Sequence, residues 1–305
     1  MKPSDVLAMV LLAAIWGASF LFLRMAAPTV GSLAIAALRV TGAALLLLPL
    51  LMARGELPRL KPLLPALLVS AVLSYVLPFW GISQSARTLP AGLLSILNAT
   101  TPLWGALVGW CWSGERLSGN RLLGLAIGLG GVALLAADRS QIHSKAAWQA
   151  VALSLGSTLM YALAVHHAKR YLGSLSALNV SAGSLGCAAL MLMAPAWWLG
   201  PQPAQGPALG WPQVPLPVWG AVLGLAAMCT ALAYLLFYRL IARVGPTKAL
   251  TVTFLVPVFG MLWGWLFLSE RITLSMMAST AVIVVGTLLS SGAWSPVAAR
   301  IRKHA

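Results

Sequence analysis

Residues 101–118 read TPLWGALVGWCWSGERLS, and residues 256–273 read VPVFGMLWGWLFLSERIT. The two stretches align without a gap at an offset of 155 residues. The pairs that carry the match are Pro102 with Pro257, Gly105 with Gly260, Gly109-Trp110 with Gly264-Trp265, and Glu115-Arg116 with Glu270-Arg271. Matching leucines and alanines are expected between any two apolar segments, but aligned proline, glycine, tryptophan and charged residues indicate an internal duplication.

The duplication extends beyond this stretch in both directions. Further pairs at the same offset are Leu77 with Leu232, Gly131 with Gly286 and Leu134 with Leu289, and a looser offset of 145 pairs Trp16 with Tyr161 and Arg24 with Lys169. We therefore expect two tandem repeats at residues 1–140 and 141–295, followed by a basic tail at 296–305.

The composition predicts that both repeats lie in a membrane. The chain is 60% hydrophobic and only 8% charged, which is too few charges for the surface of a soluble domain of this length. A helix needs about 20 apolar residues to cross the hydrocarbon core. Ten runs qualify, at 5–26, 32–53, 63–84, 91–112, 119–137, 147–168, 175–199, 217–239, 246–267 and 273–291. The runs do not alternate as barrel strands do, so the predicted fold is an all-α membrane protein with ten transmembrane helices.

Five helices per repeat is an odd number, so the second repeat must cross the membrane in the opposite sense to the first. Such inverted repeats recur in transporters. The net charge of +15 arises from basic residues in the short gaps between apolar runs. This pattern is typical of cytoplasmic loops rather than of a nucleic-acid-binding face. A cytoplasmic N-terminus places most of these residues inside, and both termini are then expected in the cytoplasm.

Several short motifs, taken together, resemble those of a known family. Ile15-Trp16-Gly17 with Phe20, Arg39 early in the second span, and the two Pro…Glu-Arg segments are together similar to the EamA family of the drug/metabolite transporter superfamily. The resemblance covers almost the whole chain. It implies ten helices, cytoplasmic termini, a bacterial inner-membrane location, and export of amino acids or related small metabolites by alternating access.

Polar and aromatic residues within the spans are candidates for binding a small-molecule substrate. They are Trp16, Ser19, Tyr75, Trp80, Asn98 and Thr101 in the first repeat, and Tyr161, Tyr234, Tyr238 and Thr253 in the second. Asn98 is costly in lipid unless it has a partner. It could present hydrogen bonds to a substrate or only join helices. Arg39 could attract a substrate carboxylate or only snorkel to the membrane surface.

Coupling to protons usually requires a carboxylate within the membrane. The five acidic residues, which all lie at predicted helix ends or loops, are Asp5, Glu56, Glu115, Asp138 and Glu270. We therefore expect a facilitator, or export driven by the electrical gradient. His166 and His167 could titrate near neutral pH, or could simply lie at the membrane interface beside Lys169 and Arg170.

The Glu115-Arg116 and Glu270-Arg271 pairs admit two interpretations. They could lock opposite faces during switching, or each Glu could lie at a helix turn and favour the N-terminus of the following helix. Alternative functions are a channel or an intramembrane enzyme. The sequence has no HExxH or GxSxG motif and no paired aspartates at membrane depth, so no catalytic residues, metal or cofactor are predicted. Beyond substrate and lipid, we expect a monomer or weak homodimer that does not bind nucleic acid.

Overall fold

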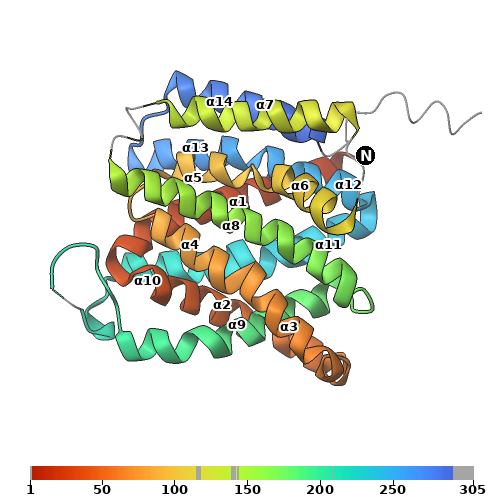
Figure 1. Cartoon of the computed structure of the whole chain (residues 1–305). Helices are drawn as coiled ribbons and strands as arrows, with labels where there is room; N and C mark the ends of the chain where they lie inside the picture. The colour runs from red at the N-terminus through yellow and green to blue at the C-terminus, as the bar shows by residue number, and fades with distance from the viewer. Residues whose placement is uncertain (1, 115–117, 139–141, 143, 208, 291–305) are drawn as a thin grey trace, which may run out of the picture.

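Every regular element in the computed structural model is a helix, within the residues that it describes: 2–114, 118–138, 142, 144–207 and 209–290 (Figure 1). Nine helical spans in this part of the chain are long and apolar enough to cross a membrane. A tenth apolar helix, Leu274–Ser290, is shorter and ends at the last described residue. The all-α membrane fold is therefore confirmed, whereas the predicted tail at 296–305 lies outside the described residues.

Five spans come from the first repeat. They are α1 (Pro3–Val30); α2 (Ser32–Ala53); one continuous span of η1 (Leu57–Arg59), η2 (Lys61–Leu63), α3 (Leu64–Ala71), η3 (Val72–Val76) and α4 (Leu77–Ser85); α5 (Ala91–Asn98) with α6 (Thr101–Ser113); and α7 (Gly119–Ala136). The third span begins before the predicted residue 63. Pro58 and Pro62 each lie in the first turn of a short 3-10 helix, a position where a missing N–H costs nothing.

Five more come from the second repeat. They are α8 (Lys145–Tyr171); α9 (Ala177–Leu199); α10 (Leu216–Leu223) with η5 (Gly224–Leu232) and α11 (Ala233–Val244); α12 (Pro246–Ala249) with η6 (Leu250–Phe254) and α13 (Val256–Leu268); and α14 (Leu274–Ser290). A short 3-10 helix, η4 (Trp211–Gln213), precedes α10. Hydrophobic packing crosses the repeats, because Leu97 of α5, Val151 of α8 and Met261 of α13 share one buried core.

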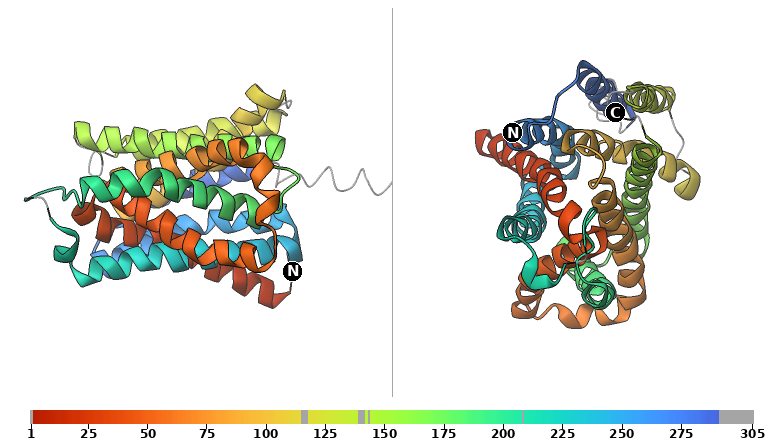
Figure 2. Two further views of the ribbon diagram at one scale, coloured as in Figure 1. Left: turned by 90° about the horizontal axis from the view of Figure 1, so that it is seen from below. Right: turned by 90° about the vertical axis from the view of Figure 1, so that its left-hand side faces the viewer.

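The two repeats run in opposite senses. We call the end of the bundle where α1 begins the N-terminal face, and the end where α1 finishes the far face (Figure 2). The segment between α9 and α10 lies at the far face, where Gln202 donates its backbone N–H to the carbonyl of Val30 at 3.0 Å. Successive spans alternate, so α8 starts at the far face whereas α1, its counterpart in the first repeat, starts at the other.

Backbone irregularities recur at equivalent positions of the two repeats. The fourth span is interrupted just before Pro102, and the ninth has a 3-10 segment just before Pro257. α6 and α13 end in left-handed caps at Gly114 (φ 64°) and Ser269 (φ 54°), and Ser269 is the only non-glycine residue with positive φ in the described ranges. The third and eighth spans both contain π-helix, in η3 and η5. Shared irregularities of this kind are evidence for duplication that apolar composition alone cannot supply.

Glycines bring the last helix of each repeat into backbone contact. A Cβ atom on Gly286 of α14 would lie 2.4 Å from the backbone nitrogen of Gly128, and one on Gly124 would lie 2.4 Å from that of Ser290. Small residues allow helices to approach this closely in membranes. α7 and α14 therefore pack against each other along the edge of the bundle (Figures 1 and 2). The glycine stripe of α7 thus contacts the second repeat of the same chain.

Candidate functional site

A buried arginine lies where the two repeats meet. Arg39 is seven residues into α2 from Ser32, which is about 10 Å along the helix axis, and only 9% of its surface is exposed. Its Nε donates a hydrogen bond to Thr230 Oγ1 of η5 at 3.0 Å. Its guanidinium carbon lies 3.9 Å from the ring centroid of Phe79 in α4. The side chain is therefore held inside the bundle and does not snorkel to the surface.

Tyrosines from both repeats surround this arginine. The ring centroids of Tyr75 and Tyr234 are 6.4 Å apart, and Tyr75 also meets Phe79 edge-on at 5.5 Å. Tyr234 lies 6.1 Å from Tyr238, whose hydroxyl hydrogen-bonds to that of Ser181 in α9. We call this connected group the central cluster; its members are Arg39, Tyr75, Phe79, Ser181, Thr230, Tyr234 and Tyr238. The cluster brings together hydroxyl groups, aromatic ring faces and one cation.

Two further predicted residues lie beside the central cluster. Tyr161 of α8 packs against the hydrophobic core that contains Tyr75 and against the core formed around α5. Trp16 of α1 packs against Phe237, with ring centroids 5.2 Å apart, and the ring of Phe237 lies 6.2 Å from that of Tyr238 in the cluster. Ser19 is also buried, at 6% exposure, in the helix that carries Trp16.

The remaining predicted residues are not brought into the central cluster by any described contact. Trp80 is 38% exposed and lies on the bundle surface, as expected for a lipid-facing side chain. Thr101 and Thr253 donate hydrogen bonds to the backbone carbonyls of Asn98 and Leu250, respectively. Such local bonds satisfy the hydroxyl group within its own helix. Asn98 itself is half-buried at the end of α5.

Sequence reasoning missed three members of the cluster: Phe79, Ser181 and Thr230. A signal for two of them was present, because Thr230 lies 155 residues after Tyr75, and Tyr234 lies 155 residues after Phe79. Equivalent positions of the two repeats therefore contribute to the cluster. Tyr75 and Thr230 lie in the π-helices η3 and η5, and Phe79 and Tyr234 lie in the α-helices that follow them. Ser181 carries no such signal, since its role depends on the hydroxyl of Tyr238, a residue 57 positions away.

The acidic residues that the structure describes lie at the ends of helices. Asp5 pairs with Arg243 at 3.6 Å on the N-terminal face, and Glu56, Asp138 and Glu270 follow α2, α7 and α13. Glu115 lies outside the described residues. Within the described part of the chain, no carboxylate pairs with Arg39, and its bond to Thr230 is the only hydrogen bond of its guanidinium.

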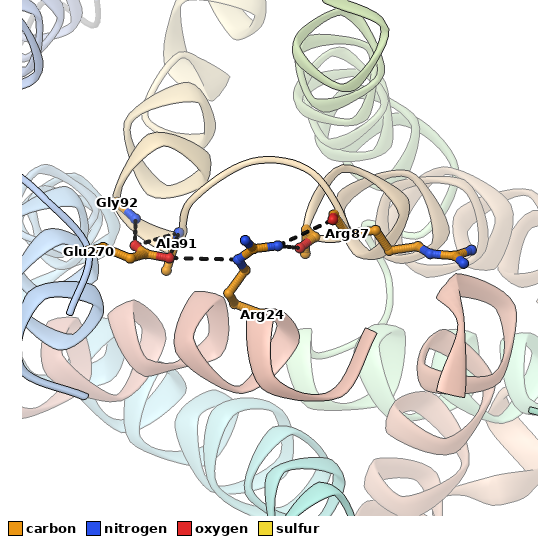
Figure 3. Close-up of polar contacts among 6 residues, drawn as sticks. Arg24, Arg87, Ala91, Gly92 and Glu270 are labelled. Carbon is orange, nitrogen blue, oxygen red and sulfur yellow. Dashed lines mark hydrogen bonds and ion pairs between the residues drawn. The ribbon is translucent and has the colours of Figure 1, made fainter. Parts of the chain in front are cut away.

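Glu270 joins the two repeats at the far face (Figure 3). Its carboxylate accepts the backbone N–H of Ala91 at 2.9 Å and that of Gly92 at 3.4 Å, at the first turn of α5. It also lies 3.8 Å from Arg24 Nε. Arg24 in turn donates to the carbonyl oxygens of Ala86 at 3.0 Å and Arg87 at 3.2 Å. We call these residues the far-face network; it ties α1, α5 and the end of α13 together beside a surface hollow of about 530 Å³.

The network corrects one interpretation of the sequence. The sequence predicts for Glu270 either a charge pair with Arg271 that locks opposite faces during switching, or a position near the N-terminus of the helix that follows it. Instead it caps α5 of the other repeat, and Arg271 is exposed. The equivalent Glu115-Arg116 pair lies outside the described residues.

His167, for which the sequence leaves open a titrating role or an interfacial position, is 6% exposed, and its Nε2 lies 3.0 Å from the carbonyl oxygen of Ala66 in α3.

Inverted halves that meet around a buried polar centre are the architecture of a secondary solute transporter. The model of the EamA-like transporter family matches residues 4–137 and 148–292. The chain therefore belongs to the EamA-like transporter family, with one match in each repeat, and it is a membrane transporter.

Individual relatives agree with this assignment. The chain is 28% identical over 289 residues to the uncharacterized transporter YvbV of Bacillus subtilis, covering 94% of this chain and 92% of that one. It is 31% identical over 149 residues to the uncharacterized inner membrane transporter YedA of Escherichia coli, covering 47% and 46% of the two chains. A solved crystal structure of a protein with 16% identity covers both chains completely with a TM-score of 0.61, which supports the fold.

Proposed function

We propose that the protein exports amino acids or related small metabolites across a bacterial inner membrane, with its N-terminal face in the cytoplasm. The observation that carries this proposal is the position of the central cluster. Arg39, Tyr75 and Phe79 come from the first repeat, and Thr230 and Tyr234 come from the second. Relative movement of two inverted repeats would expose a site at their interface to each side in turn.

Export is proposed to proceed without proton coupling and without catalysis. The described carboxylates lie at helix ends, and within the described residues the central cluster contains no acidic side chain. A proton-coupled carrier needs a group that titrates along the route of the substrate. The membrane potential or the solute gradient remains as the driving force.

The test is counterflow in proteoliposomes loaded with a panel of unlabelled amino acids and N-acyl amino acids. We expect trans-accumulation of the labelled counterpart of at least one solute, saturable with concentration and unchanged when the pH gradient is abolished. Empty liposomes are the control. Flux that is linear in concentration and shows no counterflow would indicate a channel, and flux that requires an imposed pH gradient would contradict the proposed driving force.

A further inference from the structure

We propose that Arg39 binds the carboxylate of a solute carrying one net negative charge, and that the rings of the central cluster contact its apolar body. This assignment rests on the proposed transport function, whose substrate class it narrows. Three features of the site support it: the incomplete compensation of a buried cation, the charge balance of the cluster, and the presence of the cation in only one repeat.

The protein compensates the Arg39 cation only in part. A guanidinium has five N–H donors in a planar fork, and the described residues accept one of them, at Thr230. The Phe79 ring adds a cation–π contact at 3.9 Å, which is a weaker interaction than an ion pair in a desolvated site. Burying a charge within a membrane protein is costly unless it is paired. The unused face of the fork is therefore suited to a planar anion that accepts two parallel hydrogen bonds.

The charge balance of the cluster selects a monoanion. Arg39 is the only charged member of the central cluster, so one carboxylate neutralises it, whereas a phosphate dianion would leave an excess negative charge in a low-dielectric site. A zwitterion would bring an ammonium group close to the guanidinium with no carboxylate in the cluster to hold it. Solutes with a carboxylate but no free ammonium, such as N-acylated amino acids or oxo acids, fit this arrangement best.

The cation occurs in one repeat only. At the offset of 145 that relates the first helices of the repeats, the counterpart of Arg39 is Ser184, which is fully buried in α9. Other cluster positions are aromatic or hydroxyl-bearing in both repeats, namely Tyr75 with Thr230 and Phe79 with Tyr234. A single anion site would therefore serve both orientations of the carrier, with no second site to which the solute must pass.

The experiment compares a carboxylate with its neutral isostere on the purified full-length protein in detergent. The probes are N-acetylphenylalanine, which is ionised at pH 7.5, and N-acetylphenylalaninamide, which is not. Apparent affinities come from the dependence of the melting temperature on probe concentration. We expect the wild-type protein to bind the acid at least about 10-fold more tightly than the amide, since a hydrogen-bonded charge contributes about 1.5–3 kcal/mol and each 1.4 kcal/mol is tenfold.

Two variants and a control separate binding from folding. Arg39→Gln removes the charge and should weaken binding of the acid about 10- to 100-fold while leaving binding of the amide unchanged. Arg39→Lys keeps the charge but not the fork, and should retain part of the preference for the acid. Arg239→Gln, on an exposed position of α11, should behave as wild type. If Arg39→Gln does not fold, the acid-to-amide ratio of Arg39→Lys compared with wild type still decides the matter.

Several outcomes would overturn the assignment: equal binding of acid and amide by the wild-type protein, no binding of the acid at all, or a preference for the acid that survives in Arg39→Gln. The counterflow assay shows whether only the carboxylate site at Arg39 is wrong or whether the proposed transport function is wrong as well. A protein that counterflows solutes lacking a carboxylate, and does so equally well with Arg39→Gln, remains a transporter whose substrates are not selected by Arg39.

Discussion

An inside-negative membrane potential of 100 mV is expected to hold N-acetylphenylalanine at an outside-to-inside concentration ratio of about 50 in proteoliposomes containing this protein. Moving one elementary charge through 100 mV is worth about 2.3 kcal/mol, and 1.4 kcal/mol is a factor of ten. The ratio follows because the solute carries one negative charge and no proton accompanies it, since no member of the cluster is a carboxylate or a histidine. Potential alone would then drive export.

The measurement uses liposomes loaded with potassium and treated with valinomycin, with labelled N-acetylphenylalanine initially equal on both sides. Labelled phenylalanine, which has no net charge at neutral pH, is the matched solute and should stay near a ratio of one. Liposomes without protein report the passive leak of the acid. If the acid counterflows but its ratio stays near one under an imposed potential, transport is electroneutral and the proposed charge balance is wrong.

Replacing Glu270 with alanine is expected to destabilise the protein by about 3 kcal/mol, the lower end of the cost of breaking a buried ion pair. The lower end applies because the side chain of Arg24 is 32% exposed, whereas that of Glu270 is 15% exposed. The substitution leaves the N–H groups of Ala91 and Gly92 without their acceptor and removes the only carboxylate that pairs with Arg24 among the described residues. We expect the melting temperature in detergent to fall on the order of 5–10 °C.

Two neighbouring variants calibrate this effect. Glu270→Gln keeps one carbonyl acceptor for the first turn of α5 and should cost less than the alanine variant. Arg271→Ala, the adjacent exposed residue, should leave the melting temperature within about 1 °C, since exposed charges contribute little. A loss for Arg271→Ala as large as that for Glu270→Ala would mean that the far-face network does not hold the two repeats together.

The fold could be predicted from the sequence because its two strongest signals are local. Apolar runs mark the spans, and the aligned prolines at Pro102 and Pro257 reveal the duplication. An odd number of helices per repeat then requires inversion. The spans, the duplication and the inversion can all be inferred without knowing which side chains contact one another.

The site was harder to predict because membrane helices are apolar on every side. The sequence therefore does not distinguish a lipid-facing Trp80 from an inward-facing Tyr75. Whether Arg39 snorkels or stays buried depends on Thr230, a partner 191 residues away. Glu270 has an arginine beside it in the chain, yet its partners are Arg24 and the backbone at Ala91, 179 residues distant. The burial of Arg39 and the partners of Glu270 are therefore determined by tertiary contacts between the repeats.

Transport by alternating access requires the central cluster to open to each face of the membrane in turn. Ser181→Cys places a thiol there with little change of volume, in a protein whose Cys111, Cys187 and Cys229 are replaced by alanine. Labelling with a membrane-impermeant thiol reagent is then compared in right-side-out and inside-out vesicles. We predict labelling from both faces, slowed in each case by N-acetylphenylalanine. Labelling from one face only, or protection on neither, would contradict alternating access to this cluster.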